Sequence, residues 1–243
     1  MRTLLLAVMM PAALFSQTEP EIGSEAAPKM NIVKTNVTAY AFRNVNLTYE
    51  RVISKRFSVS VGYGTVAKGG IPFSNSFIKD TEFEDIEISQ SHFTIEPRIY
   101  LGQGYGKGFY FAPYYRHTTF DAENVVLDVN YSGDTVPMAI SGQAKGNSAG
   151  LMVGAQWFLG KMDSWVLDFW IAGGHYGGGK GDFRARSPRP LTPTEQAELK
   201  GEIEDLDIPF VDYTVATDTN GANINVDGPW AGVRSGLSLG YRF

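Results

Sequence analysis

The chain has 243 residues, of which 43% are hydrophobic and 19% charged, and its formal net charge is −5. The negative charge gives no basis for nucleic-acid binding, and the absence of cysteine excludes disulfides and thiolate catalysis. The length suits a single domain, and no segment has the ~20 consecutive apolar residues that a transmembrane helix needs.

The N-terminal segment has the pattern of an export signal. Arg2 precedes a short apolar run, Leu4 to Phe15, and Ser16 is a small residue at a plausible cleavage point. We therefore predict a signal peptide over residues 1–16, a polar periplasmic lead-in over 17–32, and one outer-membrane domain over 33–243. An exported chain without a transmembrane helix can cross a membrane only with strands.

Alternating hydrophobic and polar residues predict eight strands in the remaining chain. Within each predicted strand one face is apolar and the other is small, polar or charged. In chain order the strands are Val33–Phe42, Val45–Ile53, Phe57–Thr65, Glu87–Leu101, Gly108–Phe120, Asn147–Leu159, Ser164–Tyr176 and Trp230–Phe243.

The connections between the predicted strands alternate in length. Three connections are short: Ser54–Arg56, Gly102–Lys107 and Gly160–Asp163. Three are long: Val66–Ile86, Asp121–Gly146 and Gly177–Pro229. Arg43-Asn44 is a tight turn on the same side as the long connections. This sorting is typical of membrane barrels. The sequence therefore predicts an all-β fold: an eight-stranded antiparallel up-and-down transmembrane β-barrel with short periplasmic turns and long outer loops.

The long connections contain structural signals of their own. Thr192-Pro193-Thr194-Glu195 is a capping box that predicts a short acidic helix over Pro193–Asp205. Phe210–Thr217 and Ala222–Val226 flank the turn dipeptide Asn220-Gly221 and predict a hairpin. Val125–Tyr131 and Val136–Ser141 predict a second outer hairpin.

The polar faces of the strands carry charges that would point into the barrel. An eight-stranded barrel has an interior just wide enough to be filled by side chains, so these charges predict a salt-bridged plug. Arg51 and Pro97 fall on the apolar face; Arg51 lies near a rim, and Pro97 suggests a bulge or register shift. The predicted inner network is Glu50, Glu96, Arg98, Arg116, Asp168, Arg234 and Arg242.

The last predicted strand alternates up to the final residue. Leu239, Tyr241 and Phe243 share its apolar face, and Gly240 and Arg242 share the other. A strand that ends in this way resembles the closing strand of bacterial outer-membrane barrels. The resemblance implies that Leu239, Tyr241 and Phe243 form a signal for the barrel-assembly machinery.

Three histidines, His92, His117 and His175, lie near the outer ends of their predicted strands. One hypothesis is acid–base or nucleophilic chemistry on outer-leaflet lipid, assisted by Ser89, Ser91, Asp80, Asp85 or Asp121. A three-histidine metal site is another. No spacing identifies a triad, so the preferred interpretation is a polar rim with no catalytic residue, no metal and no cofactor.

The domain from Val33 onward resembles the small outer-membrane β-barrels of the OmpA/OmpX type. The resemblance rests on the export signal, Lys34-Thr35-Asn36, Asn46-Leu47-Thr48-Tyr49-Glu50 and the Gly240-Tyr241-Arg242-Phe243 ending. It implies a non-enzymatic integral protein of the bacterial outer membrane, in contact with lipid and lipopolysaccharide, with a structural role or a surface-interaction role through its outer loops. An outer-leaflet lipid-modifying enzyme and a narrow passive transporter remain the alternatives.

Overall fold

A computed structural model describes residues 28–70, 87–131, 134–205 and 210–243 of the chain. The signal peptide predicted over residues 1–16, most of the predicted lead-in, and the candidate residues Asp80 and Asp85 lie outside these ranges. Among the described residues, none of the helices has the length and hydropathy needed to cross a membrane.

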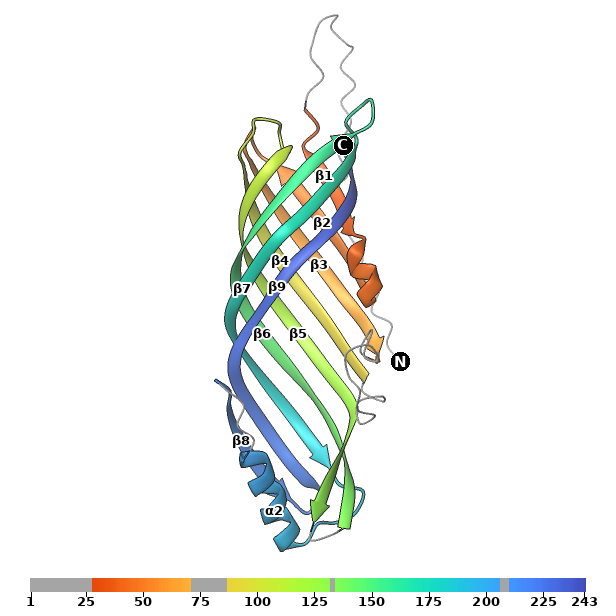
Figure 1. Ribbon diagram of the computed structural model, residues 1–243, viewed down its shortest axis with the longest axis vertical. Helices are drawn as coiled ribbons and strands as arrows, with labels where there is room; N and C mark the ends of the chain where they lie inside the picture. The colour runs from red at the N-terminus through yellow and green to blue at the C-terminus, as the bar shows by residue number, and fades with distance from the viewer. Residues whose placement is uncertain (1–27, 71–86, 132–133, 206–209) are drawn as a thin grey trace, which may run out of the picture.

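Eight antiparallel strands form a closed ring (Figure 1). From β1 to β7 each strand pairs with the next one in the chain, and β7 pairs with β9. β1 and β9 close the ring over the register Ile32↔Arg242 to Asn36↔Ser238. The ring strands are β1 (Asn31–Asn36), β2 (Asn44–Val52), β3 (Phe57–Gly69), β4 (Glu87–Tyr100), β5 (Gly108–Tyr131), β6 (Asp134–Leu159), β7 (Trp165–Arg186) and β9 (Gly221–Arg242).

The three predicted short turns, Ser54–Arg56, Gly102–Lys107 and Gly160–Asp163, lie at one end of the ring, which we call the turn end; the opposite end is the extension end. The last residue also lies at the turn end, where the Phe243 N–H donates to the Asn31 carbonyl at 2.9 Å. The predicted ring of eight strands and the position of its three short turns are therefore confirmed. The first strand begins at Asn31, two residues before the predicted boundary.

The prediction that the first strand continues to Phe42 is wrong. β1 ends at Asn36, and a 3₁₀ helix, η1 (Thr38–Phe42), follows it. The Asn36 Oδ1 accepts hydrogen bonds from the Thr38 hydroxyl and the Ala39 N–H, at 2.7 and 3.1 Å, and so starts this helix. Arg43, at φ 57°, then turns the chain into β2, where the sequence predicts a tight turn.

Two of the predicted loops contain long strand segments. β5 and β6 continue as a paired hairpin through residues predicted as the loop Asp121–Gly146, and β7 and β9 stay paired out to Arg186 and Gly221. A ninth strand, β8 (Asp212–Asp218), pairs with β9, and the helix α2 (Pro193–Glu204) lies beside them. The predicted outer hairpins and helix are confirmed as elements.

The extended strands project beyond the ends of β1–β4 (Figure 1). We call this projecting part the outer extension: residues 117–131 and 134–147 of the β5–β6 hairpin, 178–186 of β7, 221–229 of β9, together with β8 and α2. Among the described residues its distal part has no closed ring, because β4 pairs with β5 only as far as Glu87↔Glu123 and β1 and β2 do not pair with the extension.

Pro97 is accommodated without the expected bulge or register shift. The β4–β5 ladder runs to Ile95↔Tyr115 and resumes in the same register at Ile99↔Phe111, which places Pro97 opposite Pro113. Neither proline has an N–H to donate, so the ladder is interrupted between these pairs.

Candidate functional site

The inside of the ring holds a cluster of charged side chains, which lies beside buried apolar and aromatic side chains. We call this cluster the charge network: Lys34, Glu50, Glu96, Arg98, Asp168 and Arg234. Strand alternation points them inward from β1, β2, β4, β7 and β9. The Lys34 ammonium lies 2.5 Å from Glu50 and 2.6 Å from Asp168, and all three side chains are fully buried.

Arg98 connects the two halves of the charge network. Its Nη1 lies 2.8 Å from Asp168 and 3.2 Å from Glu50, and its Nε donates to Glu96 at 2.7 Å. Its Nη2 lies 2.6 Å from the same Glu96 oxygen but outside hydrogen-bond geometry. The other Glu96 oxygen accepts from Arg234 at 3.2 Å, so Glu96 is shared between two guanidinium groups.

Neutral groups satisfy the remaining carboxylate oxygens. Glu50 accepts from the hydroxyls of Ser58 and Tyr100 at 2.6 and 2.7 Å, and Asp168 accepts from the Tyr110 hydroxyl at 2.8 Å. Gln156 accepts from Lys34 at 2.6 Å. Buried charges are tolerated when they are paired and hydrogen-bonded in this way.

The structure brings together five of the seven predicted network residues and places the other two elsewhere. Arg242 lies at the turn end, where its Nε donates to the Lys29 carbonyl at 2.8 Å and its guanidinium stacks on Phe158 at 4.2 Å. Arg116 lines a cavity beyond the network. Neither has a carboxylate partner within ion-pair distance among the described residues.

Four buried residues that belong to the charge network or form hydrogen bonds with it are absent from the predicted inner network: Lys34, Tyr100, Tyr110 and Gln156. Strand alternation carries the signal for them, because each lies on the inner face of a residue range that the sequence predicts as strand and that is strand in the structure. The predicted inner network contains only charged residues, and none of them comes from the first strand.

The three histidines do not share a rim. His92 and His175 point into the ring, where His175 Nδ1 lies 3.0 Å from the Tyr114 hydroxyl. His117 lies on the outer face of β5, 2.8 Å from the Asn147 side-chain oxygen. They are not at strand ends either, since β4, β5 and β7 all continue past them. In the described ranges, no cluster of three or more acidic or histidine side chains could hold a metal ion.

The outward faces of the ring strands carry exposed apolar side chains. On β6 these are Leu151, Val153, Trp157 and Leu159, which are 38–53% exposed. On β9, Leu239, Tyr241 and Phe243 point outward as predicted, at 45–53% exposure. Arg51 also faces outward and donates to Asn31 near the turn end, at 2.7 Å.

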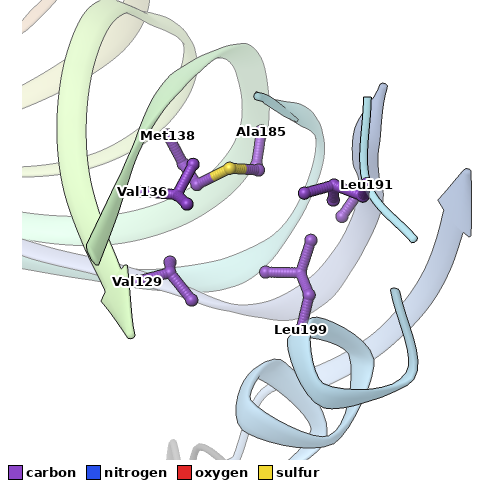
Figure 2. Packing of buried hydrophobic residues seen from close by; sticks show 7 residues of the cluster. Val129, Val136, Met138, Ala185, Leu191 and Leu199 are labelled. Atoms are coloured by element: carbon purple, nitrogen blue, oxygen red, sulfur yellow. The ribbon is translucent and has the colours of Figure 1, made fainter. Parts of the chain in front are cut away.

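The outer extension has its own apolar core (Figure 2). Leu199 of α2 and Leu191 before it pack against the inward faces of the extended strands. Thr192 and Glu195 complete the predicted capping box, and the Arg189 side chain lies 2.5 Å from Glu195. The hydrogen bond from Arg189, followed by that from the Thr192 N–H, lowers the pKa of Glu195 to about 2. The strand residues of this core are Val129, Val136, Met138, Ala185 and Ala222.

Side-chain polarity therefore inverts along single strands. In the extension, β6 buries Val136 and Met138 and exposes Ser141, Gln143 and Lys145. In the ring, the same strand buries Ser148 and Gln156 and exposes Leu151 and Trp157. The inversion lies between Asn147 and Leu151 on β6.

The family model described as "Protein of unknown function (DUF3575)" matches residues 8–189, which is more than half of the chain. No curated protein and no solved structure matches the chain.

Proposed function

The chain belongs to the DUF3575 family, and we propose that it is an integral β-barrel protein of the bacterial outer membrane. In this proposal the ring crosses the bilayer, the charge network closes its interior, and the outer extension stands above the lipid as a folded surface for interaction. The observation that carries the proposal is the inversion of side-chain polarity along the strands that the ring and the extension share.

The exposed apolar side chains on the outward faces of the ring strands form a band, which we call the apolar band. Its contact with water is unfavourable, and its contact with lipid is favourable. Each buried apolar side chain of this size contributes ~1.5–3 kcal/mol relative to exposure, and the band includes residues from every ring strand except β1. On β7 it runs from Trp165 to Tyr176, a length comparable with the ~9–11 residues that a tilted strand needs to cross a bilayer.

Aromatic side chains at both borders of the band support the same placement. Tyr115 and Tyr176 lie where the band meets the polar extension, and Trp165 and Tyr241 lie at the turn end, with ring centroids 5.9 Å apart. Tyrosine and tryptophan prefer the two membrane–water interfaces.

The proposed partners follow from this placement. Outer-membrane lipid contacts the apolar band, and lipopolysaccharide surrounds the base of the outer extension. The outward residues Leu239, Tyr241 and Phe243 of the closing strand are the proposed recognition element for the barrel-assembly machinery.

The proposed role is structural or interactive rather than catalytic or transporting. Histidine chemistry is disfavoured because His117 lies on the opposite face of the sheet from His92 and His175. Transport is disfavoured because Lys34, Glu50, Arg98 and Asp168 cross the interior with no exposed side-chain surface.

Cysteine labelling tests the proposal cleanly because the native chain has no cysteine. Leu151→Cys and Ser141→Cys place single thiols on the outward face of β6, on either side of the polarity inversion. With the folded protein in lipid vesicles, we expect a membrane-impermeant maleimide to label Ser141→Cys and to leave Leu151→Cys unlabelled until the protein is denatured.

Heat-modifiable gel mobility verifies that both variants are folded before labelling. Equal labelling of the two thiols in vesicles would show that the apolar band faces water, and the membrane placement would then be wrong.

A further inference from the structure

A cavity of about 350 Å³ lies inside the ring next to the charge network, toward the extension end. Thr38 and Phe42 of η1 line it on one side, and Arg98 and Glu96 of the network line it on another. Its volume lies near the lower limit of the ~300–1,000 Å³ that small-molecule sites occupy.

The cavity holds a cation without a counter-charge. In the charge network and around the cavity the described residues contribute four cations, Lys34, Arg98, Arg116 and Arg234, but three carboxylates, Glu50, Glu96 and Asp168. All three carboxylates are already engaged by the other cations.

Arg116 is the cation that remains. Its side chain lines the cavity together with that of Arg234, so two positive charges face the same space. A largely buried charge of this kind is costly unless an opposite charge joins it.

Polar atoms without partners face the same cavity. The Nδ1 of His92, the Oγ1 of Thr94 and the Oδ1 of Asn44 are buried and accept or donate no hydrogen bond among the described residues. Thr94 itself is 5% exposed. The hydroxyl and the imidazole can both act as donors, and buried polar groups are normally hydrogen-bonded.

We propose that this cavity is a binding site for a small oxyanion, a carboxylate or phosphate group carried by a solute or a lipid headgroup. Arg116 and Arg234 provide two guanidinium forks for its oxygens, a geometry suited to carboxylate and phosphate. Thr94 and His92 donate to the remaining oxygens. Trp170 and Phe42 supply an apolar wall for the attached part of the ligand.

This site goes beyond the proposed function, because it depends on the interior of the ring and not on what surrounds the ring. The guanidinium of Arg234 is held in place by Glu96 and by the rings of Tyr114 and Trp170, at 4.6 and 4.7 Å. One of the two forks is thus positioned in advance of binding, which reduces the entropy cost of binding.

Calorimetric titration of the full chain, folded in an uncharged detergent, tests the site at constant ionic strength. The probes are inorganic phosphate, acetate and a short-chain phosphatidic acid, with chloride as the reference anion. We expect saturable binding of at least one oxyanion to the wild type and an affinity about tenfold or more lower in Arg116→Gln. Arg184→Gln, which removes an exposed outward arginine of β7, is the matched control and should leave the affinity unchanged.

The three probes separate the sources of the ligand. Binding of phosphate or acetate indicates a free solute, and binding of phosphatidic acid alone indicates a lipid headgroup. If Arg116→Gln fails to show heat-modifiable mobility, Arg116→Lys keeps the charge and removes the fork, and a several-fold loss of affinity is expected. The absence of saturable binding to all three probes, or equal affinity in wild type and the Arg116 variant, would overturn the proposal.

Discussion

The ring and the outer extension share four strands but are built with opposite polarity. In the ring, β6 turns Gln156 inward toward Lys34 and exposes Trp157. In the extension it turns Met138 inward against Leu199 and exposes Lys145. Alternation therefore identifies which residues share a face, whereas the surroundings of each region decide whether that face is polar or apolar.

The two interiors also gain stability in different ways. The extension buries aliphatic side chains, and the free energy gained is roughly proportional to the apolar surface area removed from water. The ring interior buries charges, whose desolvation offsets much of their attraction, so its stability depends on every partner being present. The two regions should consequently respond very differently to the loss of one side chain.

The largest effect is expected from Asp168→Ala in the charge network. It removes a carboxylate that accepts from Lys34, Arg98 and Tyr110, and breaking a buried ion pair of this kind costs ~3–5 kcal/mol. Urea unfolding of the detergent-folded protein measures the change. Asp182→Ala, an exposed outward position of β7, is the control and should change stability by less than ~0.5 kcal/mol.

A loss below ~1 kcal/mol for Asp168→Ala would mean that the charges of the ring are not mutually dependent. The contrast between the two interiors would then disappear.

A smaller and more local effect is expected from Leu199→Ala in the apolar core. Removing this buried side chain should cost ~2–5 kcal/mol, because a cavity remains between α2 and the strands. Hydrogen exchange over residues 190–205 should rise, while the ring keeps its heat-modifiable mobility.

Glu202→Ala, exposed on the same helix, is the matched control and should leave the exchange unchanged. Loss of the heat-modifiable mobility in Leu199→Ala would show that the two regions fold as one cooperative unit.

The smallest effect concerns the cap of α2 and depends on pH. The pKa of Glu195 is lowered to about 2 in the folded protein, from an ordinary value of 4.5, by Arg189 and the Thr192 N–H. A depressed carboxylate pKa stabilises the fold above the unfolded pKa, and this contribution is lost as the pH falls through the folded value. Protection of residues 190–205 should thus be greater in wild type than in Glu195→Gln at pH 6.

Hydrogen exchange, corrected for intrinsic rates, should show this difference shrinking between pH 4.5 and pH 2. A difference that is independent of pH would assign the stabilisation of the cap to hydrogen-bond geometry instead of charge.

The sequence predicts the ring well because alternation is strongest where one face of a strand is apolar. Phe57–Thr65 and Asn147–Leu159 show this, and both lie within observed strands. The segment that joins the ring to the outer hairpin of β5 and β6 gives a weaker signal, because residues such as Gln143 and Lys145 alternate with glycine and alanine. Such strands have no hydrophobic periodicity, and tertiary pairing determines them.

The candidate site could be predicted only in part. Alternation of side chains between the two faces of a strand identifies inward charges such as Glu50 and Arg98. The same alternation also places Lys34 on the inner face. It does not reveal that Arg242 turns away to Phe158 or that Arg116 stays without a carboxylate, because those outcomes depend on distances across the ring. The 3₁₀ helix after Asn36 was missed because its side-chain hydrogen bonds override the β propensity of the segment.

The continuity of β5, β6, β7 and β9 through the polarity inversion has a mechanical consequence. Their hydrogen-bond ladders continue on both sides of the boundary, with the register at Asn147↔Gly178 following Ala149↔Tyr176. A pull on α2 would load these ladders lengthwise, in shear, so that many bonds resist together instead of opening one by one. A partner attached to the tip would accordingly transmit its force to the ring through the paired strands.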